Sequence, residues 1–219
     1  MRSLVLLLFG AAWAFAQPFS AGVRGGLPLT DFLNAAGSVR TSGIDSFTTH
    51  TNRYIIGVTG ELHLPFGFGV EVDALYRHLN YQNTTSIVGI TTTFANSNTT
   101  GNAWEFPLLA KYRFPSKVVR PYVVAGIAWD TLQGLKQAIT KGIIAVPATT
   151  TSTTSSPAEL NQNTTRGFVT GVGVDVHALV VHLQPELRYT RWGARHFLDT
   201  NGLLHSNQNQ AEFLLGITF

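Results

Sequence analysis

The 219-residue chain contains no cysteine, so no disulfide holds it together. Only 12% of its residues are charged, about half of what soluble domains carry. A surface with so few charges does not suit an ordinary soluble domain. The formal net charge of +3 provides no basic patch of the kind that binds nucleic acid, and we expect no nucleic-acid partner.

Beyond residue 16 the chain also lacks a continuous apolar run of the roughly 20 residues that a membrane-crossing helix needs. Yet 44% of its residues are hydrophobic, and they are spread along the sequence. Such a distribution is typical of alternating strands with one face in lipid.

The first 16 residues have the features of an export signal. Arg2 is positive, Leu4 to Leu8 are apolar, and Ala14 and Ala16 have the small-residue spacing that a signal peptidase needs. The apolar part is too short for a membrane anchor. We therefore predict a cleaved signal peptide at residues 1–16 and a single domain at residues 17–219.

The rest of the chain alternates apolar and polar residues with the period of two that indicates strands. In the segment 120–129 both alternate rows are apolar, so its two faces stay unassigned. The turn near residue 178 lacks the usual turn residues and is the least defined boundary. We predict eight strands, at about 19–29, 52–64, 68–81, 104–114, 120–129, 168–177, 181–192 and 209–219.

The connections alternate between long (30–51, 82–101, 133–165, 193–208) and short (65–67, 115–119, near 178). This asymmetry is typical of bacterial outer-membrane barrels, whose long loops lie outside the cell. We predict an all-β fold, an eight-stranded antiparallel up-and-down transmembrane β-barrel with both termini periplasmic. A soluble β-sandwich is the alternative, but its outward face would carry more charge. The run 149–156 is predicted to be a mobile loop. The sequence does not decide whether an extra hairpin forms within 136–146.

Aromatic residues at strand ends favour the headgroup boundary of a membrane. We predict two aromatic belts. The outer belt consists of Tyr54, Tyr81, Trp104, Trp129 and Trp192, and the periplasmic belt of Phe68, Phe114 and Phe219.

The second row of each strand places charges of both signs inside the barrel. Eight strands leave an interior just wide enough for side chains, so these charges must pair. We interpret them as a structural plug, with a gated ion path as the alternative. The predicted interior network is Glu61, Glu71, Asp73, Arg77, Glu105, Lys111, Arg113, Asp175, Glu186, Arg188 and Glu212.

Enzymatic chemistry has little support in the sequence. His205, Ser206 and Glu212 are residue types of a catalytic triad and superficially resemble those of outer-membrane lipid A deacylases, but neighbouring strand residues point to opposite faces. The seven histidines have no metal-binding spacing. We expect no catalytic residue, no metal and no cofactor.

Several segments resemble the outer membrane protein β-barrel family, the OmpA/OmpX-like or "porin family" small barrels. They are 104–112 (WEFPLLAKY), 120–122 (RPY), 185–189 (PELRY) and the ending 216–219 (GITF). The resemblance covers the whole predicted domain, although no peptidoglycan-binding domain follows the barrel. It implies a location in the bacterial outer membrane and insertion by the barrel-assembly machinery.

The alternating end of the chain has a predicted role of its own. Phe213, Leu215, Ile217 and Phe219 form one lipid-facing row by their alternation, and the family resemblance implies that this row is an assembly signal.

The leading functional hypothesis is a structural or surface-interaction barrel in outer-membrane lipid, with a surface ligand that the sequence does not identify. A narrow pore for small solutes is the second hypothesis, and a lipid-modifying enzyme is the third.

Overall fold

The computed structural model describes residues 19–40, 43–116, 119–144, 146–178 and 181–219. The predicted signal peptide (1–16) and the residues at the predicted turn after residue 178 lie outside the described part. No helix in the described part is long and apolar enough to cross a membrane.

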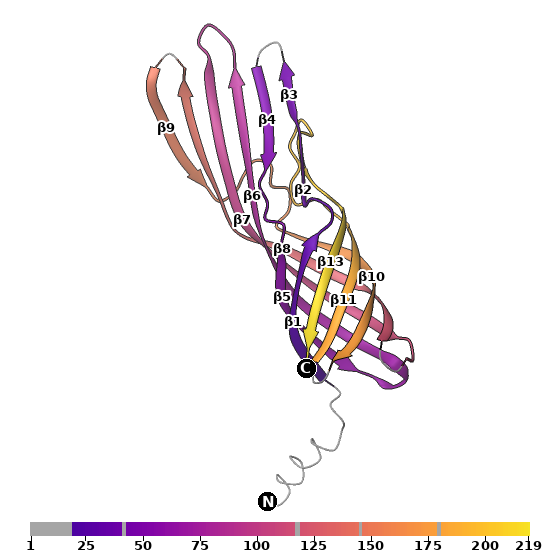
Figure 1. Cartoon of the computed structure of the whole chain (residues 1–219). Coiled ribbons are helices and arrows are strands. Elements are labelled where there is room, and N and C mark those ends of the chain that lie inside the picture. The colour runs from indigo at the N-terminus through magenta and orange to yellow at the C-terminus, as the bar shows by residue number, and fades with distance from the viewer. Residues whose placement is uncertain (1–18, 41–42, 117–118, 145, 179–180) are drawn as a thin grey trace, which may run out of the picture.

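Eight strands form a closed antiparallel barrel, which confirms the predicted fold (Figure 1). The barrel closes because β1 pairs with β5 on one side and with β13 on the other. Around the barrel the order is β5, β1, β13, β11, β10, β8, β7 and β6. The strands are β1 (Phe19–Pro28), β5 (Ile55–His63), β6 (Phe68–Ile87), β7 (Thr93–Arg113), β8 (Val119–Ile143), β10 (Thr164–Ala178), β11 (Val181–Trp192) and β13 (Asn209–Thr218).

Three of these strands are much longer than the sequence predicts, and the prediction of long loops at 30–51, 82–101 and 133–165 is wrong. β6, β7 and β8 continue past the barrel and are joined by β3 (Gly37–Arg40), β4 (Gly43–Thr49) and β9 (Val146–Thr154). The pairs β3–β4, β4–β6, β6–β7, β7–β8 and β8–β9 make one projecting sheet, which we call the arm (Figure 1).

The arm escaped prediction because its strands are rich in Thr, Ser and Asn and have no apolar alternation. A strand with water on both faces needs no such alternation, and threonine favours strands. The run 149–156 is therefore not a mobile loop, since residues 149–154 belong to β9. The open question of an extra hairpin within 136–146 is also answered. Residues 136–143 belong to one strand, β8, and the strand that pairs with it is β9, so the hairpin extends well beyond this segment.

The barrel has two different ends. β13 ends and β1 begins at one end, which we call the terminal end, where the 3-10 turn η1 (Pro65–Gly67) joins β5 to β6. The arm projects from the opposite end, which we call the arm end (Figure 1). A register shift between Thr100 and Asn102 of β7, opposite Gly134 with φ of 63°, marks where the barrel passes into the arm. Such bulges bend strands.

The outward face of the barrel is a band of exposed apolar side chains, as the alternation predicts. Phe213, Leu215 and Ile217 of β13 face outward as predicted, and Phe219, which directly follows the strand, is 66% exposed. The corresponding rows of the other strands include Phe19, Val23, Leu27, Ile56, Val58, Leu62, Val72, Phe106, Leu108, Val123, Ile127, Phe168, Val172 and Leu187.

Two members of the predicted outer aromatic belt point the other way. Tyr81 and Trp192 are only 1% and 2% exposed and lie on the inward rows of β6 and β11. The sequence already indicated this orientation. Residues an even number of positions apart on a strand share a face, and Tyr81 and Trp192 each stand four positions from an inward-facing arginine, Arg77 and Arg188. Tyr76 and Tyr189 stand on the outward rows at this end instead. The remaining predicted belt residues Tyr54, Trp104, Trp129, Phe68, Phe114 and Phe219 are exposed or half-buried on the outside.

Two loop segments, residues 30–36 and 193–208, fold over the arm end of the barrel and form what we call the cap. Their short strands β2 (Leu33–Ala35) and β12 (Leu204–Ser206) pair with each other. Phe32, Phe197 and Leu204 then pack on inward-facing residues of the barrel and the arm. The buried cluster comprises Phe32, Leu33, Phe47, Leu79, Tyr81, Ala103, Leu132, Leu135, Phe197 and Leu204.

The part of the arm formed by the outer β8–β9 hairpin should be dispensable for the barrel. We predict that replacing residues 138–153 with Asn-Gly, a two-residue turn between the paired Gln137 and Thr154, changes the free energy of unfolding by less than about 0.5 kcal/mol. The barrel ladder and the β6–β7 pairing stay intact in this variant. Urea unfolding in lipid vesicles and the gel shift of folded barrels provide the measurement. Loss of the folded band would show that the arm contributes to the barrel's stability.

Candidate functional site

The structure places every charged residue of the predicted interior network inside the barrel. Their exposed fractions range from 0% for Glu71 to 7% for Arg113. Each comes from the inward row of its strand, because successive side chains on a strand alternate between the two faces. They form a cluster in the centre of the barrel, a cluster toward the terminal end and a smaller cluster toward the arm end.

Glu71 is the hub of the central cluster. Its Oε2 accepts hydrogen bonds from Lys111 Nζ at 2.7 Å and from Arg24 Nη2 at 3.1 Å, and its Oε1 accepts one from Arg188 Nη2 at 3.1 Å. Asp73 Oδ2 accepts from both arginines, at 2.9 and 2.8 Å. Three cations and two carboxylates from four different strands therefore meet at one level of the barrel.

The wall around this hub is also occupied. Arg188 Nε donates to Glu186 at 2.7 Å, and the Tyr122 hydroxyl donates to the other oxygen of Glu186 at 3.0 Å. The ammonium of Lys111 lies 4.1 Å from the centre of the Tyr122 ring. Gly173 faces the same ring so closely that a Cβ there would lie 2.4 Å from it. The Tyr122 ring therefore packs directly against the backbone of the neighbouring strand β10, where only glycine leaves room for it.

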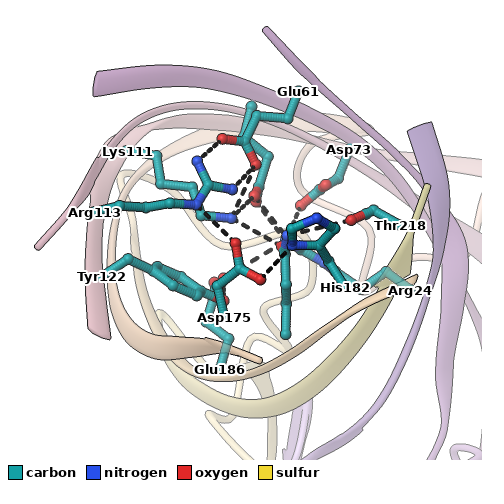
Figure 2. Close-up of polar contacts among 12 residues, drawn as sticks. Arg24, Glu61, Asp73, Lys111, Arg113, Tyr122, Asp175, His182, Glu186 and Thr218 are labelled. Carbon is teal, nitrogen blue, oxygen red and sulfur yellow. Dashed lines mark hydrogen bonds and ion pairs between the residues drawn. The ribbon is translucent and has the colours of Figure 1, made fainter. Parts of the chain in front are cut away.

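Toward the terminal end, Arg113 holds two carboxylates (Figure 2). It pairs with Glu61 through both Nη atoms and donates through Nε to Asp175 at 3.0 Å. His182 Nδ1 lies 2.8 Å from the other oxygen of Asp175. Lys111 Nζ, 3.2 Å from Glu61, links this cluster to the central one.

Toward the arm end the interior becomes rich in carboxylates. Arg77 Nη2 donates to both Glu105 and Glu212, at 2.7 and 3.0 Å, and the guanidinium stands 5.2 Å from the Phe32 ring of the cap. Asp130 lies 3.2 Å from Nε2 of His196, which also belongs to the cap. One arginine and one histidine thus face three buried carboxylates.

Sequence reasoning missed four important interior residues. They are Arg24, Tyr122, Asp130 and Gln184, all at most 1% exposed. Arg24 could have been found, since it lies between the outward-facing Val23 and Gly25 of an irregular, glycine-rich strand. The inward orientation of Asp130 could not be predicted, because both alternate rows of its strand are apolar and its two faces could not be assigned.

The arrangement leaves little space for a solute. At the arm end a small cavity of about 70 Å³ lies beside the cap, with Arg77 among its lining residues. This volume holds only a few water molecules. Below it, the paired charges of the three clusters occupy the lumen.

The side chains of the three residues considered as a catalytic triad, His205, Ser206 and Glu212, do not hydrogen-bond with one another. His205 lies 3.4 Å from Asn34, the Ser206 hydroxyl accepts a hydrogen bond from the Phe197 N–H at 3.3 Å, and Glu212 binds Arg77 inside the barrel. Among the described residues, no group of three or more His, Asp or Glu side chains is arranged to hold a metal ion.

A family model for the outer membrane protein beta-barrel domain matches residues 3–214 of the chain. The chain belongs to this family. No curated protein sequence matches it. Solved structures that it resembles include OprG from Pseudomonas aeruginosa, with 12% identity, 91% of this chain and 92% of that chain covered and a TM-score of 0.46. Another is Neisserial surface protein A, with 14% identity, 92% and 96% covered and a TM-score of 0.39.

Ail from Yersinia pestis, solved in complex with the heparin analogue sucrose octasulfate, is similar at 7% identity, with 93% and 100% of the chains covered and a TM-score of 0.41. The family assignment rests on the sequence model alone.

As a member of the outer membrane protein beta-barrel family, the chain lies in the bacterial outer membrane. Its outward apolar band therefore faces lipid, and its inward charges lie at membrane depth, away from bulk water. An unpaired charge in this interior costs several kcal/mol.

Arg188 tests the energetic role of the central cluster. We predict that Arg188→Ala destabilises the barrel by about 3–5 kcal/mol, because Glu71, Asp73 and Glu186 lose a shared cation. Urea unfolding in lipid vesicles measures the difference. A loss under about 1 kcal/mol would contradict the prediction.

Two matched variants control for general effects of removing charge. Arg53 is exposed and pairs with Asp31 at 3.4 Å, so Arg53→Ala should cost less than about 1 kcal/mol. Glu105→Gln should be tolerated far better than Arg188→Ala, because Glu105 competes with Glu212 for one guanidinium.

Proposed function

We propose that this protein is a closed outer-membrane barrel that acts through its arm at the cell surface, in a structural or surface-interaction role. One observation carries the proposal: the lumen is filled by paired charges and covered by the cap, whereas the largest exposed structure outside the barrel is the arm. A filled lumen supports no transport function. His205, Ser206 and Glu212 have separate partners, so the triad considered from the sequence gives no support to a lipid-modifying enzyme.

We place the terminal end in the periplasm and the arm end outside the cell. The short connections lie at the terminal end and the long extensions at the arm end, as is usual for outer-membrane barrels. Both ends of residues 17–219 would then be periplasmic, after cleavage of residues 1–16. In this orientation the row that ends at Phe219 would be presented to the barrel-assembly machinery as the assembly signal.

The arm offers backbone edges to a partner. Among the described residues, neither β3 nor β9 has a neighbour on its outer side. Edge strands are normally protected by charges or prolines. β9 has one proline, Pro147 near its start, and residues 149–154 contain only Thr and Ser. An extended polypeptide could pair with this edge by adding a strand, with main-chain hydrogen bonds providing affinity.

The pore hypothesis predicts that small solutes pass through the barrel, whereas the filled lumen predicts that they do not. We expect liposomes that contain the purified wild-type barrel to swell no faster in small sugars than protein-free liposomes, and planar bilayers to show no discrete conductance steps. The physical reason is the paired charges that fill the lumen of an eight-stranded barrel. Rapid swelling with the wild-type protein would overturn the plug and establish the pore.

The arm edge can be tested with a peptide of the β9 sequence, residues 146–154. We expect this peptide to bind intact cells that display the protein, because it can add as a strand to the free edge. A peptide with Thr151→Pro should bind at least tenfold more weakly, since proline cannot donate to the ladder.

Cells that display Thr150→Lys/Ser152→Lys are the matched control and should bind the peptide more weakly, because charges on the β9 edge oppose strand addition while the β7–β8 pairing stays intact. Binding only after permeabilisation would reverse the proposed orientation. Equal binding to the control variant would remove the β9 edge from the proposal.

A further inference from the structure

Most of the outward face at membrane depth is uncharged, but one groove at its arm-end margin contains two arginines. The groove has a volume of about 360 Å³ and lies across β8, β10 and β11. Its lining residues are Ile127, Trp129, Arg166, Gly167, Phe168, Arg191 and Gly193. Trp129 stands opposite Arg166 on the neighbouring strand, and Phe168 stands opposite Arg191.

These arginines differ from the four interior arginines of the barrel by having no acidic partner. Arg24, Arg77, Arg113 and Arg188 each pair with buried carboxylates. Within the described ranges, no Asp or Glu lies within ion-pair distance of Arg166 or Arg191, and both are exposed.

The polar contact of Arg191 is with a neutral group. Its Nη1 donates to Asn209 Oδ1 at 2.6 Å, and the Tyr189 hydroxyl donates to the same oxygen at 2.8 Å. The contact orients the guanidinium without neutralising it. An external anion is the group that would complete the site.

The position of the groove indicates the kind of anion. On β8 the exposed residues Val123 and Ile127 lead to Trp129, and on β10 Val172 and Phe168 lead to Arg166. Tryptophan and arginine at the end of an apolar row mark the headgroup boundary of a membrane. A ligand in this groove would therefore contact hydrocarbon on one side and headgroups on the other.

We propose that this groove binds a lipid of the outer leaflet whose headgroup carries more than one phosphate. Acyl chains would pack on Ile127, Trp129 and Phe168, and the phosphates would bind Arg166 and Arg191. Guanidinium groups suit phosphate because they donate two parallel, charge-assisted hydrogen bonds. Assignment to the outer leaflet rests on the proposed orientation, whereas the lipid chemistry rests on the groove alone.

The test measures binding of lipid A, a diphosphorylated glucosamine lipid, to the purified protein in neutral detergent micelles. The comparison ligands are monophosphoryl lipid A, phosphatidylglycerol and phosphatidylcholine. We expect the highest affinity for lipid A with its two phosphates. Monophosphoryl lipid A and phosphatidylglycerol, each with one phosphate and a net negative charge, should bind more weakly, and phosphatidylcholine, which has no net charge, should bind most weakly. The double variant Arg166→Gln/Arg191→Gln should bind diphosphorylated lipid at least tenfold more weakly and should no longer prefer it to the monophosphorylated form.

Arg120→Gln is the matched control, because Arg120 is also an exposed arginine but lies at the terminal end, where its Nε donates to the Ser116 carbonyl. It should bind like wild type. All variants should keep the gel shift of folded barrels, since neither groove arginine is buried. Equal affinity of wild type and double variant, or equal affinity of wild type for diphosphorylated lipid and phosphatidylcholine, would overturn the proposal.

This experiment is independent of the proposed function. Binding in micelles requires neither the orientation of the barrel nor the arm, and the variant with the shortened β8–β9 hairpin should bind lipid A normally. If the β9 peptide fails to bind cells while lipid A still binds, the arm proposal fails and the lipid site stands.

Discussion

Closure of the hydrogen-bonded ladder between β1 and β13 is the constraint on which the rest of the structure depends. In hydrocarbon every backbone N–H and C=O needs a partner inside the protein, and a sheet satisfies this only without free edges. Closing eight strands fixes a narrow interior, so the size of the lumen follows from backbone chemistry. Beyond the membrane the constraint ends, and there neither β3 nor β9 of the arm has an outer neighbour in the part of the chain that the structure describes.

The narrow interior in turn determines how the buried charges are arranged. Glu71 and Asp73 share Arg24 and Arg188, so removing a single cation leaves several carboxylates uncompensated. The cluster near the cap has fewer cations for its carboxylates, and there the cap itself contributes His196 and the ring of Phe32. The cap therefore covers the part of the interior where charge is least balanced.

Period-two alternation was sufficient to predict the barrel and the location of its charged interior. The outward face of each strand had to be apolar because it contacts lipid, and the charged residues of the chain therefore fell on the inward face. The same alternation, applied strictly, would have placed Tyr81 and Trp192 inside and Arg24 in the network. The prediction gave greater weight to residue type at strand ends than to parity. The arm could not be predicted in this way, because a sheet exposed to water on both faces leaves no periodic signal in residues such as 93–100 or 149–154.

The arginines of this protein lie in three environments, which differ in the source of the counter-ion. In the dry interior, Arg188 and its neighbours pair with carboxylates of the chain itself, because no outside ion can reach them. In water, Arg53 pairs with Asp31 in an exposed contact of little energetic weight. At the membrane boundary, Arg166 and Arg191 have no acidic partner from the described chain, while Trp129 and Phe168 beside them provide an apolar surface. A cation that is neither buried with an acid nor surrounded by bulk water is best satisfied by the headgroup of the lipid in which the barrel stands.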